Sequence, residues 1–507
     1  MALASPAVPA RPSRRSRAHY APRWPWLVPI GVFFAVGMSP MIGLPLMFAA
    51  VMALAAVVVL SRHPGPTLVG LVVFLPLQLP LFSFLYTHGV PGAVLRPAGS
   101  IKEVLALAVI LAAGREVMTG RSRLDRLDKL VLAYVCVLVL YLLLPMVLSG
   151  STYPHAFSDR LLGFRLNGGF LLLFVAARHA PIDERWRRRF VSAVLTIAGL
   201  LAALGLYQFV QPERFHDLVV NDLGIPFFQF DVLQTPLGEI VQLVRWTTAS
   251  PVRVGSLFVG PFDFADFLIL PAALLLDRLT RRDGRARDVV LLVLIGAALL
   301  ASQTRANVIA LAIMALLALS PGPQRVLANR LRLVAIVVLA LVAFVPSLVS
   351  SRLGGQAESA SSTQQHFDEI RGGFDILTQH PLGLGLGTAP SLAVRLDNAP
   401  VVISDNSILQ VGNELGVVMM GLFVVVLAAV VIRLWRADRE EPPSRLTRAA
   451  RLALIGLILA GQLHHVFQTF AVTWPLWALA GLALQGPPHR REPGEHRDAQ
   501  AAAAARS

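Results

Sequence analysis

Long apolar runs separated by short polar and basic segments dominate this chain. A transmembrane helix needs about 20 apolar residues, and fewer where the bilayer thins. Fourteen runs qualify, or twelve if the shorter ones pair as re-entrant hairpins. The pattern predicts an all-α, polytopic integral membrane protein with 12–14 transmembrane helices at residues 26–40, 43–60, 66–84, 101–113, 130–148, 162–177, 191–210, 263–277, 289–303, 306–320, 333–349, 415–434, 450–464 and 468–485.

The distribution of basic residues predicts how these spans are oriented. If the N-terminus is cytoplasmic, 34 of the 45 Lys and Arg residues fall in cytoplasmic segments and 11 fall outside. Cytoplasmic loops are enriched in Lys and Arg, so both termini are predicted to be cytoplasmic. Two extracytoplasmic loops, about 211–262 and 350–404, are long and show no clear strand or helix pattern. Because such loops are often functional, we expect any chemistry on the outer face.

The spans form one predicted membrane domain, residues 23–486, between two tails. Residues 1–22 and 487–507 are rich in Arg, Pro and Ala, which predicts disordered cytoplasmic tails. The first apolar region continues through Leu60 with no small-residue cleavage site before a mature domain. A cleavable signal peptide is therefore not expected.

Composition narrows the function classes. Hydrophobic residues make up 55% of the chain, charged residues make up 15%, and the mean hydropathy is +0.64. These values exclude an ordinary soluble enzyme and a disordered chain. The single cysteine, Cys136, excludes an intrachain disulfide. The net charge of +15 lies in clusters between apolar runs, which is the pattern of topology signals. Membrane lipid is therefore an expected partner and nucleic acid is not.

Several arginines lie at predicted outer ends, where positive charge is otherwise sparse. Arg305 sits in the turn 302–306 between two apolar runs; it could extend to the lipid headgroups, but an arginine embedded in a membrane is by default a functional-site hypothesis. Arg253 could be an ordinary loop residue, and Arg165 could be a helix-end anchor. Guanidinium groups bind phosphate in a bidentate manner, so their convergence would suit a diphosphate.

The second long loop ends in two motifs. The first, residues 380–387, is rich in glycine, but no strand–turn–helix unit surrounds it, so a dinucleotide site is not expected. Its glycines are expected to let the backbone approach a ligand or a neighbouring helix. The second motif begins at Ser404, Asp405 and Asn406, and each of these could cap the following helix. The Asp405 carboxylate could instead accept a proton from a hydroxyl.

Taken together, these motifs resemble the O-antigen ligase and polymerase superfamily of bacterial cell-envelope glycosyltransferases. The resemblance covers about residues 190–435. The similar elements occur in the family's order, and they are Gly205–Phe209, Arg253 with Gly255–Phe258, Ser302–Ala306, His380–Gly385, Asp405–Leu409 and Glu414–Gly416.

The resemblance implies a metal-independent glycosyltransferase without a cofactor in the bacterial inner membrane. Such proteins transfer a glycan en bloc from undecaprenyl-diphosphate to a hydroxyl of a glycan or glycolipid acceptor on the outer face. It implies diphosphate binding by Arg253, Arg305 and Arg165, catalysis by Asp405 and His380, and support from Asn406, Ser256 and Arg371. Ligases of the family usually carry a histidine at the position of Asp405. That departure favours a polymerase, or a ligase with an unusual acceptor.

Two other classes are weaker interpretations. A metal-dependent membrane glycosyltransferase would need acidic residues in its first outer loop, and residues 85–100 contain no Asp or Glu. A transporter or lipid flippase would show repeated halves and ionisable residues near the middle of the membrane, and neither is evident. An outer pocket that joins Arg253, Arg305 and the 350–404 loop would favour the transferase, whereas a cavity reaching the midplane would favour transport.

Overall fold

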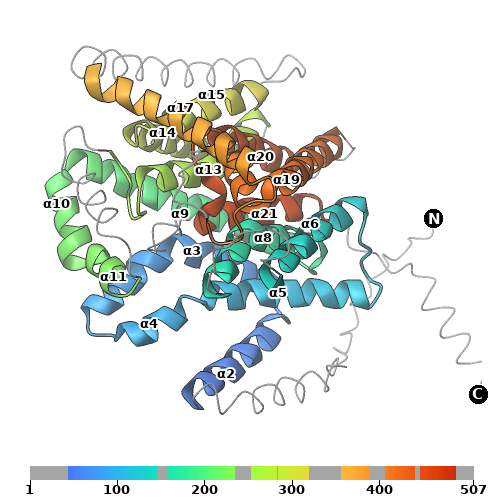
Figure 1. Ribbon diagram of the computed structural model, residues 1–507. Helices are drawn as coiled ribbons and strands as arrows, with labels where there is room; N and C mark the ends of the chain where they lie inside the picture. Colours follow the sequence, from blue (N-terminus) through green and yellow to red (C-terminus); the bar gives the residue numbers. More distant parts are fainter. Residues whose placement is uncertain are drawn as a thin grey trace, which may run out of the picture. The chain divides into compact units, whose positions relative to one another are not determined.

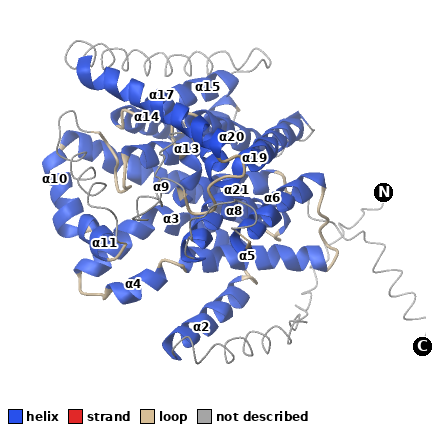
Figure 2. Cartoon of the chain, in the orientation of Figure 1, coloured by secondary structure: helices blue, strands red, loops and turns tan. Residues whose placement is uncertain are grey.

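The computed structural model describes residues 44–144, 157–233, 253–281, 284–318, 356–388, 406–439 and 446–486. Within these ranges every regular element is a helix and there is no strand, which confirms the all-α class (Figures 1 and 2). The elements are α2 (Leu44–Leu60), α3 (Pro64–Thr87), α4 (Gly92–Ala98), α5 (Ile101–Met118), α6 (Arg126–Leu143), α8 (Phe157–His179), α9 (Glu184–Val210), α10 (Pro212–Asp217), the π-helix η1 (Leu218–Asp222), α11 (Ile225–Asp231), α13 (Pro261–Thr280), α14 (Ala286–Ala301), α15 (Arg305–Ala318), α17 (Gln356–Gln379), α19 (Ser407–Arg439), α20 (Thr447–Ala460), the 3₁₀ turn η3 (Val466–Gln468) and α21 (Phe470–Ala483).

The chain divides into two compact units at residue 56. The described part of the first unit is the beginning of α2. The second unit, Val57–Ser507, contains every other described element and all of the residues discussed below.

Four of the described helices are long and apolar enough to cross a membrane. These helices are α3, α8, α9 and α19, with 24, 23, 27 and 33 residues. At about 1.5 Å per residue each is longer than the hydrocarbon core is thick. The apolar helices α15 and α21 are shorter. These helices therefore fit a multi-pass membrane protein, whereas the total of 12–14 spans and their orientation remain predictions.

Helix α8 lies at the centre of the second unit, packed against α21, α5 and α6 (Figure 1). Close approach to α21 depends on Gly481, because a Cβ there would lie 2.3 Å from the carbonyl oxygen of Phe174. The ring of Trp477 packs against Phe170 and Phe174, with centroids 5.3 and 5.8 Å apart. Small residues and close contacts of this kind hold helices together where lipid is as apolar as the protein.

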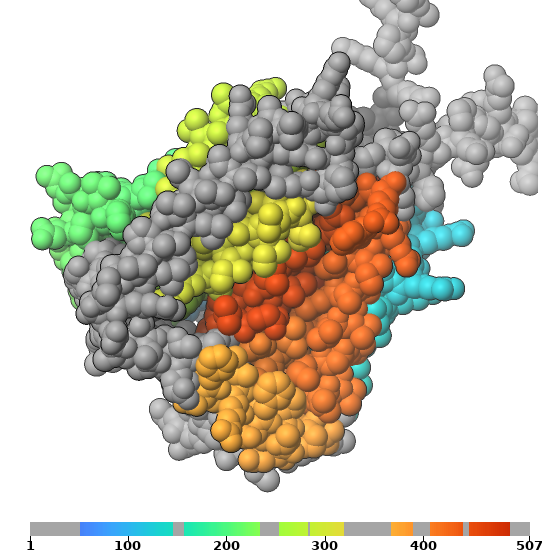
Figure 3. Space-filling view, turned by 90° about the horizontal axis from the view of Figure 1, so that it is seen from above, coloured from blue at the N-terminus to red at the C-terminus, as the bar shows by residue number. Residues whose placement is uncertain are grey.

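A second group of helices surrounds α13, which contacts α14, α15 and α20. Across one face α15, α20 and α19 follow one another in yellow, red and orange, and the amber residues of α17 border α19 (Figure 3). Gly456 of α20 makes room for Met314 of α15, whose Sδ would be 2.5 Å from an added Cβ. This group carries most of the candidate site.

Basic residues of the predicted cytoplasmic segments pair with acidic residues of the same or another cytoplasmic segment. The Arg178 guanidinium lies 2.5 Å from Asp125 and 2.7 Å from the buried carboxylate of Asp128. Partial burial raises the pKa of Asp125, but hydrogen bonds from Arg178 and the backbone outweigh it and hold that pKa well below its usual range. Arg451 pairs with Asp438 at 3.1 Å. The predicted cytoplasmic ends are thus bound together by ion pairs.

The two long segments predicted to lie outside contain helices that the sequence analysis did not predict. Helix α17 occupies 24 residues of the segment 350–404, and α10, η1 and α11 lie in the segment 211–262. The first half of α17 is almost wholly polar, so it carries no apolar stripe. Its second half has apolar residues at helical spacing, with Ile370, Phe374 and Leu377 three to four residues apart. The interpretation that these two segments have no helix pattern was therefore wrong.

The glycine-rich turn after α17 packs against a break in α19. Gly416 interrupts the helix with φ 85° and ψ 171°, and the N–H of Val417 donates to the carbonyl of Pro381 at 2.9 Å. A Cβ on Gly416 would lie 2.4 Å from the Pro381 oxygen, and one on Gly383 would lie 2.5 Å from the Glu414 oxygen. The expectation that these glycines let the backbone approach a neighbouring helix is confirmed.

Substituting Gly416→Ala should destabilise the protein, because only glycine readily adopts that backbone conformation and the new Cβ would clash with the turn. The expected loss is about 1–3 kcal/mol or more. Gly421→Ala in the same helix is the matched control, since nothing lies within 4 Å of its added Cβ. The control should be neutral or slightly stabilising. Thermal unfolding in detergent measures both, and equal melting temperatures would contradict the assigned role of the break.

Removing the guanidinium in Arg178→Ala should destabilise the fold, because it leaves the buried Asp128 carboxylate without its main counter-charge. Breaking a buried pair in this way costs about 3–5 kcal/mol. The control is Arg188→Ala, which breaks the exposed pair with Glu184 and should cost at most about 1 kcal/mol. Comparison of the melting temperatures of the two variants tests the difference.

Candidate functional site

Two arginines predicted to bind a diphosphate lie next to each other. Arg253 precedes α13 and is partly buried, whereas Arg305 begins α15 and is exposed. Burial lowers the pKa of Arg253, and the nearby charge of Arg305 lowers it further. Neither guanidinium forms an ion pair with any carboxylate in the described residues. The two guanidinium groups form a concentrated positive site.

The backbone next to Arg253 is held by α9. The Gln208 side-chain oxygen accepts hydrogen bonds from the N–H groups of Gly255 and Ser256 at 3.0 and 2.9 Å. Ser256, at φ 50°, donates its hydroxyl to the α9 backbone at 2.9 Å. Gly205 leaves space for Val254, whose Cγ1 would lie 2.8 Å from an added Cβ. Two motifs quoted for the family resemblance, 205–209 and 253–258, are thus one structural unit.

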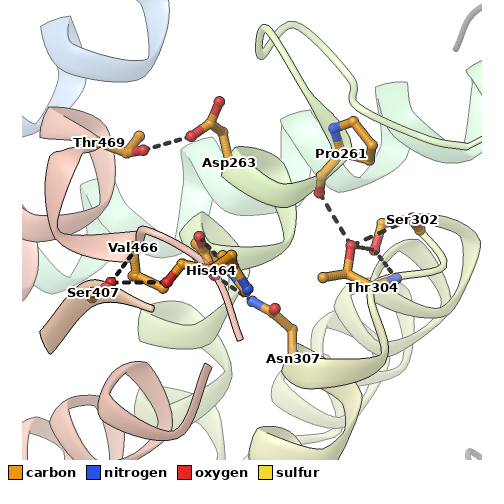
Figure 4. Close-up of polar contacts among 10 residues, drawn as sticks. Pro261, Asp263, Ser302, Thr304, Asn307, Ser407, His464, Val466 and Thr469 are labelled. Carbon is orange, nitrogen blue, oxygen red and sulfur yellow. Dashed lines mark hydrogen bonds and ion pairs between the residues drawn. The ribbon is translucent and has the colours of Figure 1, made fainter. Parts of the chain in front are cut away.

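The turn between α14 and α15 positions Arg305. Residue Gln303 has φ 56°, which ends α14 and lets α15 begin two residues later. The Ser302 hydroxyl donates to Thr304 at 3.1 Å, and Thr304 reaches the carbonyl of Pro261 at 3.5 Å (Figure 4). The N–H of Val254 also donates to the end of α14, at the Ala301 carbonyl, at 3.2 Å. Both arginines are therefore fixed to the same turn.

An aromatic ring connects this pair to a second polar group. The Arg253 guanidinium lies over Phe262, 4.9 Å from the ring centroid, and the ring of His464 packs on the same phenylalanine at 5.4 Å. His464 belongs to the connector, residues 461–469, that joins α20 to α21. A guanidinium over an aromatic face is attracted to the π-system, so Phe262 helps to fix Arg253.

The connector is bound to α13 and α19, and Asn307 of α15 bonds to the same α13 carboxylate as His464 (Figure 4). His464 Nε2 lies 2.8 and 3.0 Å from the two carboxylate oxygens of the buried Asp266, and Asn307 donates to the same carboxylate at 2.7 Å. The Ser407 hydroxyl donates to the His464 carbonyl at 2.8 Å. The Thr469 hydroxyl donates to Asp263.

Asn406, predicted as a supporting residue, caps α19. Its side-chain oxygen accepts from the N–H groups of Ile408 and Leu409, both at 3.0 Å, and its amide donates to the Gln462 carbonyl at 3.1 Å. Capping was the alternative interpretation of this motif, and for Asn406 it is confirmed. Asp405, the predicted base, lies outside the described residues. Its neighbour Asn406 is nevertheless bound to the connector that carries His464.

Three other predicted residues lie apart from this pair. His380 is exposed at the end of α17, where its N–H donates to the Ile376 carbonyl at 2.7 Å and its own carbonyl accepts from Gly383. Arg371 is an exposed residue of α17. Arg165 forms an ion pair with Glu103 and lies over the ring of Phe470, 5.8 Å away. None of the contacts within the described residues joins these three side chains to Arg253 or Arg305, so their predicted roles remain predictions.

The sequence analysis missed the group formed by Asp266, His464 and Asn307. Asp266 lies inside a predicted span, and an ionisable residue at such depth is a signal of function. His464 was assigned to the end of the next-to-last span, so its neighbours in space were not considered. The described part of the chain contains no set of three His, Cys, Asp or Glu residues arranged to hold a metal.

Comparison with known proteins matches part of this chain to a family. Residues 290–424 match the family described as O-antigen ligase. The matched range runs from α14 through the break of α19, and it includes Arg305 and His380. The comparison with curated proteins gives no match. The family match confirms the resemblance seen in the sequence, because residues 290–424 are similar to the O-antigen ligase family.

Proposed function

We propose that this protein transfers a glycan from a lipid diphosphate to a hydroxyl acceptor. The observation that carries the proposal is the adjacency of Arg253 and Arg305, two guanidinium groups with a shared anchor and no carboxylate partner in the described chain. Like charges repel, so the arrangement is most stable when an anion lies between them. A diphosphate provides oxygens for bidentate hydrogen bonds to both groups. The family match supports a membrane enzyme of polysaccharide assembly.

The chemistry assigned to the two arginines is electrostatic. As the acceptor hydroxyl attacks the anomeric carbon, the bond from that carbon to the diphosphate oxygen breaks and negative charge grows on the leaving group. Donors fixed before the reaction stabilise this charge without reorganising. The turn at 302–304 and the Gln208 contacts provide that fixation. The two guanidinium groups would therefore bind the donor and also lower the barrier for its departure.

The donor we propose is an undecaprenyl-diphosphate-linked glycan, and the acceptor is a glycan or a glycolipid. The active site would face the extracytoplasmic side of the bacterial inner membrane, because the charge distribution places residues 211–262 and the turn at Arg305 there. Asp405 in the family's histidine position favours a polymerase or a ligase with an unusual acceptor. Asp405 would orient the acceptor or accept its proton, and His380 would contribute from the neighbouring loop.

Replacing either arginine by lysine should damage transfer nearly as much as replacing it by alanine. A single ammonium group cannot reproduce the planar, bidentate contact of a guanidinium. Loss of such a contact in a partly dehydrated site costs on the order of 2–4 kcal/mol, or about 30- to 1,000-fold in rate. Transfer from purified lipid-linked glycan by Arg253→Lys and Arg305→Lys in proteoliposomes measures the effect.

The matched control is Arg214→Lys, which changes an exposed arginine of the same predicted outer segment. It should transfer glycan at the wild-type rate. If Arg253→Lys and Arg305→Lys also did so at equal protein levels, the diphosphate role would be wrong. If these variants transferred glycan normally but no longer moved a labelled lipid-linked glycan across the membrane, the transporter interpretation would replace the transferase.

The proposed orientation predicts which residues can be labelled from outside the cell. Single cysteines at Arg187 and Ser361, introduced into a Cys136→Ser background, test it with a membrane-impermeant maleimide. Ser361→Cys should react in intact cells, and Arg187→Cys should react only after the membrane is opened. The reverse result would place the site on the cytoplasmic face.

A further inference from the structure

We propose that His464 is the general base of the transfer reaction and that Asp266 orients it. The inference rests on the proposed function, because it assigns the proton acceptor for the same reaction. It comes from a histidine and a carboxylate that meet from two distant parts of the chain. His464 lies on the connector after α20, and Asp266 lies in the second turn of α13.

The contact with Asp266 determines which ring nitrogen is available. Both carboxylate oxygens lie within 3.0 Å of His464 Nε2, so this nitrogen carries the proton and donates it to Asp266. Nδ1 is then the nitrogen with a lone pair, and it is the one that can accept a proton. A carboxylate opposite the donating nitrogen also stabilises the imidazolium that forms. Asn307 donates to Asp266 and fixes the carboxylate in turn.

The imidazole lies at a suitable distance from the diphosphate-binding pair. Phe262 contacts both groups, with the His464 ring 5.4 Å and the Arg253 guanidinium carbon 4.9 Å from its centroid. The two groups are therefore no more than about 10 Å apart. A sugar carbon flanked by an attacking hydroxyl and a departing phosphate fits that interval, since each hydrogen bond spans about 3 Å. Phe262 is 40% exposed whereas His464, which packs on it, is buried, so the acceptor would reach Nδ1 along the Phe262 ring.

The imidazole is not needed to hold the connector in place. The backbone of the connector is already bound to α19, because the Ser407 hydroxyl donates to the His464 carbonyl and accepts from the Val466 N–H, both at 2.8 Å. The Ser407 N–H also donates to the Gly461 carbonyl at 2.7 Å. A histidine that served only as a structural anchor would duplicate these bonds. Its side chain instead points to the buried carboxylate of Asp266.

The reaction balances without another reactant. The acceptor oxygen forms a bond to the anomeric carbon while the bond from that carbon to the diphosphate oxygen breaks. The hydroxyl proton moves to Nδ1 of His464, and the bonding electrons leave with the diphosphate, which Arg253 and Arg305 hold. The imidazolium later returns its proton to water or to the released diphosphate. Asp405 retains the role of orienting the acceptor.

The test compares His464→Gln with the matched control His88→Gln in full-length protein reconstituted with a lipid-linked glycan. Glutamine can still donate to Asp266 but cannot act as a base at neutral pH. We expect the maximal transfer rate of His464→Gln to fall about 10²- to 10⁴-fold. Its KM for the donor and its melting temperature should stay at the wild-type values. His88 is an exposed histidine whose ring packs on Phe84 of its own helix, so its variant should transfer normally.

Asp266→Asn is a second variant, in case glutamine at position 464 disturbs folding. It should lower the maximal rate, and the double variant should be no slower than His464→Gln alone, because the two residues act as one unit. Wild-type transfer by a folded His464→Gln protein would overturn the assignment, as would additive losses in the double variant. Failure of the proposed function would look different, since Arg253→Lys would then bind and transfer the donor normally.

Discussion

The site depends on one constraint, which is that backbone polar groups near the hydrocarbon core must find partners within the protein. Irregular backbone is consequently confined to places where other segments satisfy it. Here neighbouring helices supply those partners. Residues 253–256 are bound to Gln208 and Ala301, the turn 380–385 is bound to the break in α19, and the connector 461–469 is bound to Ser407. These contacts fix non-helical segments that are far apart in sequence against the helices beside them.

The candidate site differs from the rest of the described protein in how its charges are paired. Arg178 and Arg451 have carboxylate partners close by, and Arg178 stabilises the fold through a buried one. Arg253 and Arg305 are held close to each other instead, with the repulsion between them acting against folding. Rigid local contacts sustain that arrangement. Unfavourable electrostatics retained by rigid contacts are characteristic of a binding site, where a ligand of opposite charge supplies the missing stabilisation.

Local signals in the sequence predict the helical class and the membrane location, whereas a shared site for Arg253 and Arg305 is implied by the family resemblance. Apolar runs of about 20 residues identify helices in lipid, and arginines outside the cytoplasmic clusters are conspicuous. The sequence does not predict α17, whose first half lacks an apolar stripe. It also does not predict the pairing of His464 with Asp266, because this pairing depends on how α13 packs against the connector. Side chains that meet only through tertiary packing leave no spacing pattern in the chain.

Arg165 shows that an arginine is a good anion-binding candidate only when no carboxylate neutralises its charge. Its guanidinium pairs with Glu103, and Lys102 lies near the same carboxylate at 3.9 Å and over the same Phe470 ring. This group carries one net positive charge, and an anion would have to compete with Glu103 for its donors. The pair at Arg253 has no such competitor in the described chain, so the same diphosphate would gain more there. On the proposed function, the donor diphosphate would therefore bind at Arg253 and Arg305, near Phe262, rather than at Arg165.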